Sequence, residues 1–231
     1  LRGLAAQIPN QGILINGIVL QEARLSSEIE NIVTTNDDLY RAEVVADAAI
    51  DPHTKEVLRY REALNFGYRA MQDRPLSVNL FVDIVRMIKR LDFDVRRTTG
   101  TALKNAQGEV VYTPPVGESV IRDKLANLEK FLHADDGLDP LVKMAVLHYQ
   151  FEAIHPFEDG NGRLARILSD MLLARGEKSD FRFYNVSSRI NKDKNRYYDI
   201  LERMQRGDGD ITEWLVWYMQ KLVEALDEAD T

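Results

Sequence analysis

The segment DPLVKMAVLHYQFEAIHPFEDGNGRLARILSDMLLARG, residues 139–176, decides the fold. It opens with Asp139 and Pro140, a helix start in which the aspartate caps free N–H groups and the proline fits the first turn. Pro156 cannot continue this helix, so the helix should run to about residue 154. A second helix should begin near residue 162 and stop at Gly176, because glycine is common just after a helix C-terminus. The segment therefore predicts two helices joined by a short turn.

The remainder of the chain has mainly helical periodicity. Apolar residues recur at the spacing of one helix face, which predicts further helices near residues 80–91, 120–132, 192–206 and 211–228.

Two regions break the helical pattern. Residues 99–115 hold short β-prone runs on either side of Asn105 to Gly108, which predicts a hairpin followed by two prolines. The first 20 residues contain Pro9 and several glycines, and we expect an extended arm wrapped on the body. The predicted fold class is therefore all-α, or mainly α, a helical bundle with one small β-hairpin.

The composition is that of an ordinary globular protein, with 45% hydrophobic and 29% charged residues among 231. No stretch approaches the roughly 20 apolar residues that cross a bilayer, so no membrane span is expected. The net charge of −7 argues against broad nucleic-acid binding, which usually leaves a basic surface. The chain has no cysteine, which excludes disulfides and fits a cytoplasmic location. It begins at Leu1 rather than Met, and we allow for a further domain beyond either end.

The segment HPFEDGNGRLAR, His155 to Arg166, carries the chemistry. Its Gly-Asn-Gly sequence at 160–162 precedes a helix, whose N-terminus offers unpaired N–H groups and a partial positive charge to an anion. Arg163 and Arg166 share a face of the first turns of that helix. Because two cations oppose the helix dipole there, a bound anion that offsets them is expected.

Three side chains of the 155–166 segment have distinct expected tasks. His155 is the one with a reference pKa near neutrality, about 6.5, and is therefore the natural general base. Asp159, a carboxylate beside an anion site, suits a divalent cation that bridges it to a phosphate. Phe157 is placed to anchor the turn in the core. Each residue alone also fits a purely structural role, but the ordered combination is specific.

The 155–166 segment matches every fixed position of the Fic-family signature, HxFx[D/E]GNGRxxR, and the chain resembles a Fic core from Tyr112 to Tyr198. Members of this family typically transfer AMP from ATP to a hydroxyl-bearing side chain of a target protein, using Mg2+. The resemblance implies a Fic-type helical bundle whose hairpin, residues 99–113, is the flap on which a target protein docks as an added strand. Dimers are common in the family, so a homodimer is allowed for.

The resemblance also implies roles for the residues of the site. His155 would deprotonate a Ser, Thr or Tyr hydroxyl that attacks the α-phosphate, and Asp159 would hold Mg2+ across the α- and β-phosphates. Arg163 would meet the β-phosphate and Arg166 the γ-phosphate, while the Asn161 side chain would assist backbone N–H groups in holding the phosphates. The residues expected to bind the nucleotide are Phe157, Gly160, Asn161, Gly162, Arg163, Arg166, Tyr197 and Tyr198. For the two tyrosines, which match a pair near the adenosine, packing is an equal alternative.

A second motif lies near the N-terminus. Ser27 followed by Glu30 is by itself a capping box, which marks the start of a helix. The same string resembles the [S/T]xxxE[G/N] pattern of autoinhibited Fic proteins, here Ser26, Glu30 and Asn31. That resemblance implies that Glu30 pairs with Arg166, occupies the cation that the γ-phosphate needs, and leaves bound ATP out of line for attack.

The leading hypothesis is a Mg-dependent protein adenylyltransferase held at low activity by its own N-terminal region. Residues 1–75 would form the arm and the inhibitory-helix region, packed on a Fic catalytic core of residues 76–231 as a single compact unit. Three alternatives stay open: transfer of another nucleotide or phosphate-containing group, removal of AMP from a modified target, and a module that senses nucleotide without turnover. The intact His155 argues against the sensor.

His148 lies two turns before His155 on the same helical face. A metal site would enlist both histidines, but no third soft ligand follows at a suitable spacing. A hydrogen-bonded interior histidine is therefore the preferred interpretation.

Overall fold

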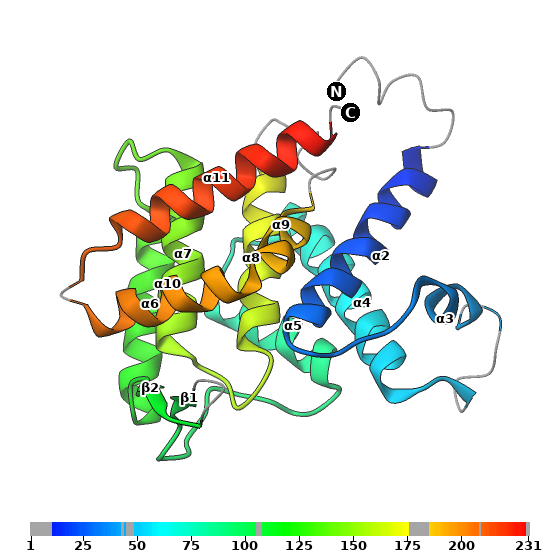
Figure 1. Cartoon of the computed structure of the whole chain (residues 1–231). Helices are drawn as coiled ribbons and strands as arrows, with labels where there is room; N and C mark the ends of the chain where they lie inside the picture. The colour runs from blue at the N-terminus through cyan, green and yellow to red at the C-terminus, as the bar shows by residue number, and fades with distance from the viewer. Residues whose placement is uncertain are drawn as a thin grey trace.

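The computed structural model describes residues 11–42, 44, 49–104, 108–175, 185–207 and 209–229, and every structural statement below concerns these residues. They form a helical protein with one small hairpin (Figure 1). The helices are α2 (Gln11–Ile29), α3 (Asn36–Arg41), α4 (Pro52–Asp73), α5 (Val78–Lys89), α6 (Glu118–His133), α7 (Pro140–Ile154), α8 (Asn161–Arg175), α9 (Val186–Lys192), α10 (Lys194–Arg206) and α11 (Thr212–Ala229). The strands are β1 (Leu103–Lys104) and β2 (Val110–Tyr112). The predicted fold class is confirmed.

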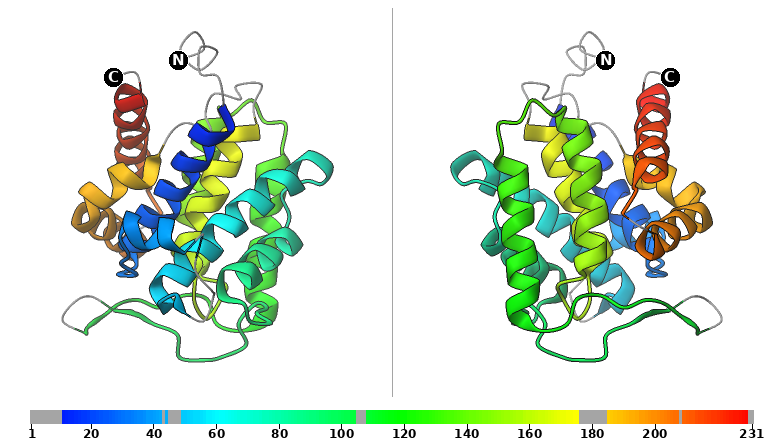
Figure 2. Two further views of the ribbon diagram at one scale, coloured as in Figure 1. Left: turned by 90° about the vertical axis from the view of Figure 1, so that its right-hand side faces the viewer. Right: turned by 90° about the vertical axis from the view of Figure 1, so that its left-hand side faces the viewer.

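Helices α7 and α8 form the centre of the molecule. Asp139 caps α7 as predicted, because its side chain accepts a hydrogen bond from the N–H of Leu141 at 2.8 Å and Pro140 fills the first turn. Most residues of both helices are buried, as their runs of apolar side chains require. Figure 2 shows α4 and α5 to one side of α8 and the helices α9 to α11 to the other.

Two apolar clusters hold the other helices to this central pair. The larger cluster packs α4, α5 and α6 against α7 and α8, with the ring of Phe81 edge-on to that of Phe151 at 5.9 Å between centroids. The smaller cluster packs α9, α10 and α11 around Trp214, which is fully buried and donates its N–H to the Ala145 carbonyl at 2.8 Å. The C-terminal end of α7, where the candidate site begins, is therefore held from both sides.

Helix α2 corrects the expectation for the N-terminus. It begins at Gln11, so residues 11–20 are helical rather than an extended arm, and residues 1–10 lie outside the described part of the chain. Val19, Leu20 and Ala23 are buried at helical spacing where α2 packs on α4 and α9. This burial outweighs the turn-forming glycines, since tertiary packing of an apolar face supplies most helix stability in proteins.

The hairpin is present where the sequence predicts it. β1 pairs antiparallel with β2, with Leu103 opposite Tyr112, and residues 105–107 lie outside the described part. The Tyr112 hydroxyl donates to the Ala153 carbonyl at 3.1 Å, and Arg206 Nε donates to the Val111 carbonyl at 2.9 Å. These two bonds fix the hairpin between the end of α7 and helix α10.

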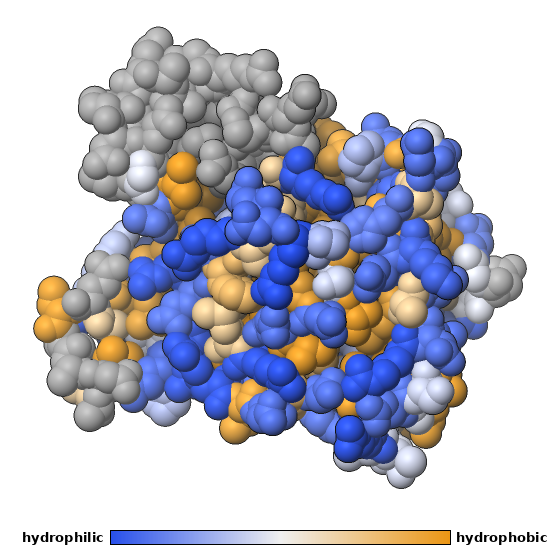
Figure 3. All heavy atoms as spheres, turned by 180° about the vertical axis from the view of Figure 1, so that it is seen from behind, coloured by the Kyte–Doolittle hydropathy of each residue, from blue (hydrophilic) through white to orange (hydrophobic). Residues whose placement is uncertain are grey.

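Charged and polar residues spread over the face opposite to that of Figure 1, with apolar residues visible between them (Figure 3). Two of the predicted helices have a shorter buried apolar face than the sequence suggested. Leu91 lies beyond the end of α5 and is 61% exposed, and Val120 of α6 is 46% exposed. Of the helices described, none has both the length and the apolar character needed to cross a membrane.

Candidate active site

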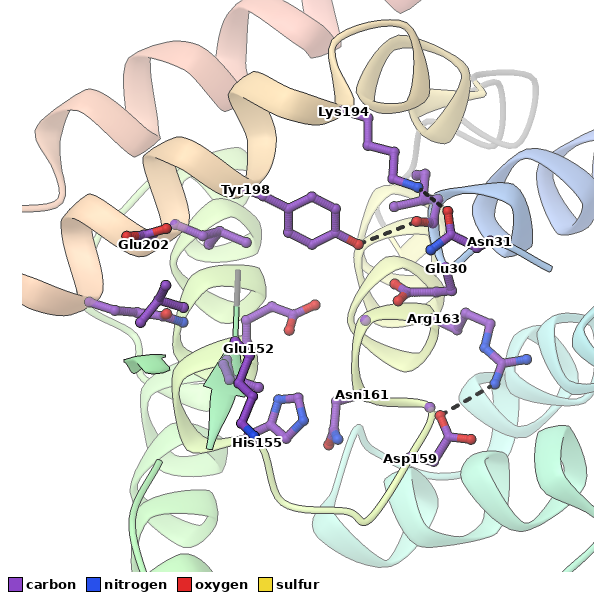
Figure 4. A pocket seen from close by; sticks show the side chains of 18 of the residues that line it. Glu30, Asn31, Glu152, His155, Asp159, Asn161, Arg163, Lys194, Tyr198 and Glu202 are labelled. Atoms are coloured by element: carbon purple, nitrogen blue, oxygen red, sulfur yellow. Dashed lines mark hydrogen bonds and ion pairs between the residues drawn. The ribbon is translucent and has the colours of Figure 1, made fainter. Parts of the chain in front are cut away.

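A cavity of about 700 Å³ opens between the C-terminal end of α2, the hairpin, the turn before α8 and helix α10 (Figure 4). The predicted site residues that line it are Glu30, Asn31, His155, Asp159, Gly160, Asn161, Gly162, Arg163 and Tyr198. Ser26, Phe157, Arg166 and Tyr197 do not line it and are buried in the interior, whereas Asn161 and Arg163 line it although each is also almost fully buried. The structure therefore divides the predicted residues into a group that faces the cavity and a group that supports it.

His155 lies where α7 ends, and its backbone has a left-handed φ of 48°. Its N–H bonds to the Phe151 carbonyl at 2.9 Å, and its own carbonyl accepts a hydrogen bond from Arg96 Nε at 2.7 Å. Burial, together with the positive charge of Arg96, lowers the pKa of His155 to about 4. The imidazole is therefore neutral at pH 7 and can accept a proton.

Asn161 holds the turn between α7 and α8. Its side-chain oxygen accepts a hydrogen bond from the Phe157 N–H at 3.0 Å, and its amide donates to the Phe157 carbonyl at 2.8 Å. Phe157 is fully buried and packs on Phe151, which anchors the turn in the core. One N–H of the Asn161 amide thus serves the turn, and the expectation that the second assists a phosphate stays a prediction.

The N-terminus of α8 allows an anion to approach closely. Gly160 has a φ of 85°, a left-handed conformation that favours glycine, and it leads the chain into α8. A Cβ at Gly162 would clash with the Glu30 carboxylate, which lies against that backbone. Since the first N–H groups of a helix attract anions, the Glu30 carboxylate occupies a place suited to a phosphate oxygen.

Arg163 belongs to an ion-pair cluster that the sequence did not reveal. Its Nη1 lies 2.8 Å from Oε1 of Glu56 on α4, and Nζ of Lys89 on α5 lies 2.7 Å from the same oxygen. Lys89 Nζ also lies 2.6 Å from Asp159, whereas Arg163 is 3.8 Å from that carboxylate. Burial opposes the ionisation of Asp159, but the two cations outweigh it, and its pKa lies below the usual value. No local pattern could have linked these residues, because only the packing of three helices brings them together.

The fit of a divalent cation rests on Asp159, whose side chain is 57% exposed at the cavity. Within the described residues, no three or more His, Cys, Asp or Glu side chains gather as a metal site. Mg2+ is, however, commonly held by one or two carboxylates together with substrate phosphates. A single carboxylate beside an anion site therefore fits Mg2+ that arrives with a nucleotide.

Helix α2 ends, rather than begins, at the string from Ser27 to Glu30. The N–H of Ile32 bonds to the Ser27 carbonyl and that of Asn31 to the Glu28 carbonyl, both at 3.0 Å, which are the two bonds of a Schellman motif. Asn31 has a left-handed φ of 61°, the conformation that this motif needs and that Gly and Asn adopt most readily. The capping-box interpretation is therefore wrong.

Arg166 is 2% exposed and holds the end of α2 through three contacts. Its Nε donates to Ser26 Oγ at 2.7 Å, and its Nη2 donates to the Ser26 carbonyl at 3.0 Å and to Glu30 Oε1 at 2.7 Å. A cation beside the last carbonyls of a helix also complements the helix dipole. The expected ion pair is present, and Glu30 lines the cavity in front of the buried arginine.

The structure separates the two tyrosines that were expected at the nucleotide. Tyr198 lines the cavity, and its hydroxyl donates to the Ile29 carbonyl at 3.4 Å. Tyr197 is 1% exposed, with its hydroxyl 2.9 Å from Nε2 of His148 and 3.3 Å from Glu152. Tyr197 therefore has a packing role, and His148 is the hydrogen-bonded interior histidine that the sequence predicted.

The fold and the site define a helical protein that places a neutral histidine and the N-terminus of α8 on one cavity. Sequence profiles then identify the family. The profile described as "Fic/DOC family N-terminal" matches residues 1–69, and the profile "Fic/DOC family" matches residues 75–173. The chain belongs to the Fic/DOC family.

Protein adenylyltransferase fic-1 of Caenorhabditis elegans is 27% identical over 134 residues, which cover 57% of this chain and 26% of that protein. Protein adenylyltransferase Fic of Nematostella vectensis is 30% identical over 155 residues, which cover 66% of this chain and 35% of that protein. The chain thus spans about a quarter to a third of the length of these relatives. The solved structure of a Fic family protein from Desulfovibrio desulfuricans G20 shares the fold, with a TM-score of 0.79 at 24% identity over 99% of this chain and 68% of that one.

Proposed function

We propose that the chain transfers AMP from ATP to a Ser, Thr or Tyr hydroxyl of a target protein, with Mg2+, and that Glu30 keeps this activity low. The observation that carries the proposal is that a neutral His155 and the N-terminus of α8 share one cavity of about 700 Å³. Cavities of roughly 300–1,000 Å³ bind small molecules. The relatives named protein adenylyltransferases support AMP as the transferred group.

In the proposed reaction, His155 accepts the proton of the target hydroxyl as the hydroxyl oxygen bonds to the α-phosphorus and the bond to the leaving pyrophosphate breaks. Backbone N–H groups of residues 160–162 and the Arg163 guanidinium hold the phosphates, so that fixed dipoles and a cation stabilise the charge that develops. Bound Mg2+ would neutralise phosphate charge, with Asp159 as its protein ligand. The ion pair with Glu56 keeps Arg163 in place.

Glu30 is the inhibitory residue in this proposal. Its carboxylate lies against Gly162 at the N-terminus of α8 and 2.7 Å from the Arg166 guanidinium. It would therefore take two positions that the phosphates of a nucleotide need. Bound ATP would then hold its α-phosphate out of line with His155. A displacement of about 1 Å costs on the order of 100-fold in rate. Withdrawal of the end of α2 would activate the enzyme.

We also propose that a target protein docks on the hairpin. Leu103, Lys104 and Val111 line the cavity. A two-stranded sheet leaves backbone groups at its edge, to which an extended segment can add as a third strand. A hydroxyl on such a segment would reach His155. The homodimer and the cytoplasmic location stay predictions.

Mass spectrometry of the modified protein identifies the transferred group. The chain carrying Glu30→Gly is incubated with ATP and Mg2+, with Glu30→Gly/His155→Ala as the matched control. We expect the mass of AMP on the first variant and no addition on the second. Addition of a phosphate or of another group, or equal modification of both variants, contradicts the proposal.

A further inference from the structure

Glu152 is a buried carboxyl group of the cavity that the proposed reaction does not use. It lies on α7, one turn before His155, and is 8% exposed. Its side chain lines the cavity and points toward the Glu30 side chain (Figure 4). Its Oε1 accepts a hydrogen bond from the Tyr197 hydroxyl at 3.3 Å.

The Glu152 carboxyl group lies close to the backbone of Gly162. A Cβ at Gly162 would lie 3.1 Å from Glu152 Oε1 and 3.2 Å from Arg166 Nη1. The carboxyl group therefore adjoins the helix N-terminus that Glu30 occupies and that phosphates occupy in the proposed reaction. The Nη1 atom of Arg166 is buried and has no hydrogen-bond partner in the part of the chain that is described.

The charged and titratable groups that face the Glu152 carboxyl from α2, α8 and α10 are Glu30, Arg166, Tyr197 and Tyr198. Burial first, and then the negative charge of Glu30, raise the pKa of Glu152 to about 7, although Arg166 and Tyr197 oppose the rise. The phosphates of a nucleotide would bring negative charge to the same place. An ionised carboxylate would repel them, whereas a protonated carboxyl group can donate a short hydrogen bond to a phosphate oxygen.

We propose that Glu152 contacts the phosphates of the bound nucleotide as a carboxylic acid, donating one hydrogen bond, so that nucleotide binding takes up a proton from solvent. This role rests on the proposed function, which supplies the nucleotide. Glu152 is then a nucleotide-binding residue outside the 155–166 segment, and its ionisation weakens binding as the pH rises.

Isothermal titration calorimetry measures the proton uptake. ATP with Mg2+ is titrated into the chain carrying Glu30→Gly/His155→Ala, whose site is open and which cannot turn over, in buffers of low and of high ionisation enthalpy. The same titration with Glu152→Gln added corrects for protons exchanged by the nucleotide, because glutamine keeps a donor but does not titrate. We expect the parent to take up about one proton more than the glutamine variant above pH 7, and its Kd to rise up to about tenfold per pH unit.

Two further variants separate a nucleotide contact from a structural role. Glu158→Gln changes an exposed carboxylate of the same cavity and should leave the proton uptake as in the parent. Glu152→Ala lacks the donor and should bind ATP more weakly than Glu152→Gln at every pH. If Glu152→Ala and Glu152→Gln bind ATP equally, or if the parent and Glu152→Gln take up equal numbers of protons, the proposed role of Glu152 is wrong. ATP binding by the parent would in that case still support the proposed function. If the parent binds no ATP, the proposed function falls as well.

Discussion

Arg166 is the residue on which the proposed inhibition depends. Its guanidinium is buried, and the Glu30 carboxylate lies 2.7 Å from it. A buried charge without a partner costs several kcal/mol, so an anion that reaches this arginine is stabilised. A carboxylate and a phosphate can both meet that need. The inhibition proposed for Glu30 would therefore be reversible, because a nucleotide would supply the same charge.

Lys89 should make the site bind Mg2+ less tightly, since its Nζ lies 2.6 Å from Asp159. We expect Lys89→Met in the Glu30→Gly background to lower, by roughly threefold, the Mg2+ concentration that half-saturates ATP binding, in line with the modest energy of a partly exposed ion pair. Calorimetric titration with ATP at a series of Mg2+ concentrations measures this half-saturating concentration. Lys124→Met, an exposed lysine of α6, is the control. An unchanged or higher Mg2+ requirement in the Lys89 variant contradicts the competition.

Glu152 should also make stability depend on pH. Its folded pKa of about 7 exceeds the ordinary value of 4.5, so its stabilisation is complete below about pH 4.5 and is lost as the pH rises through 7. We expect the unaltered chain to lose up to about 3 kcal/mol of unfolding free energy relative to Glu152→Gln over that range. Urea unfolding at pH 5 and pH 8 tests this. A difference between the two proteins that does not change with pH would count against it.

The site residues that could be predicted from the sequence are those that follow one another closely along the chain. His155, Asp159 and the glycines of the turn could be assigned together because a helix N-terminus brings them close whatever the rest of the fold. Glu56 and Lys89 could not, since they are 33 residues apart and their contact depends on how α4 packs on α5. Glu152 did leave a signal, because a carboxylate three residues before His155 shares its helical face.

The end of α2 is the element that the sequence misassigned. A Ser-x-x-Glu string fits a helix start when the two side chains cap free N–H groups. Here the N–H groups of Asn31 and Ile32 bond back to the last turn, and the Glu30 side chain instead reaches Arg166, 136 residues away. The Ser-x-x-Glu string is compatible with a helix start or a helix end, and the contact of Glu30 with the distant Arg166 favours the helix end. The helices α7 and α8 were predictable because their caps and apolar faces lie within the elements themselves.

Asn31 gives a test at the scale of this element. Its left-handed φ of 61° should make Asn31→Ala less stable than Asn31→Gly by about 1 kcal/mol, because a Cβ is strained in that conformation. Both variants lose the hydrogen bond from Lys194, so its loss cancels in the comparison. The loosened end of α2 should also make the alanine variant the more active of the two. Equal urea unfolding of the two variants would contradict the helix-end assignment.

At the scale of the whole molecule, α2 contacts helices on both sides of the predicted boundary at residue 75. It packs on α4 and on α9, and its C-terminal end is bound by Arg166 of α8. The division into an N-terminal region and a core at residue 75 stays a prediction, and the proposed inhibition would depend on these packing contacts of α2. The Glu30 carboxylate at the end of α2 lies against Gly162 and pairs with Arg166, where the proposed reaction places phosphates.

The rate of self-modification with labelled ATP and Mg2+, compared between the unaltered chain and Glu30→Gly, tests the central claim most directly. We predict a rise on the order of 100-fold, with a smaller rise for Glu30→Gln, which keeps the shape but loses the charge, and no activity once His155→Ala is added. ATP should also raise the Tm of Glu30→Gly more than that of the unaltered chain, because it then supplies the anion that Arg166 lacks. If Glu30→Gly merely lowers the Tm while its activity stays at the unaltered level, Glu30 stabilises the fold and does not restrain the enzyme.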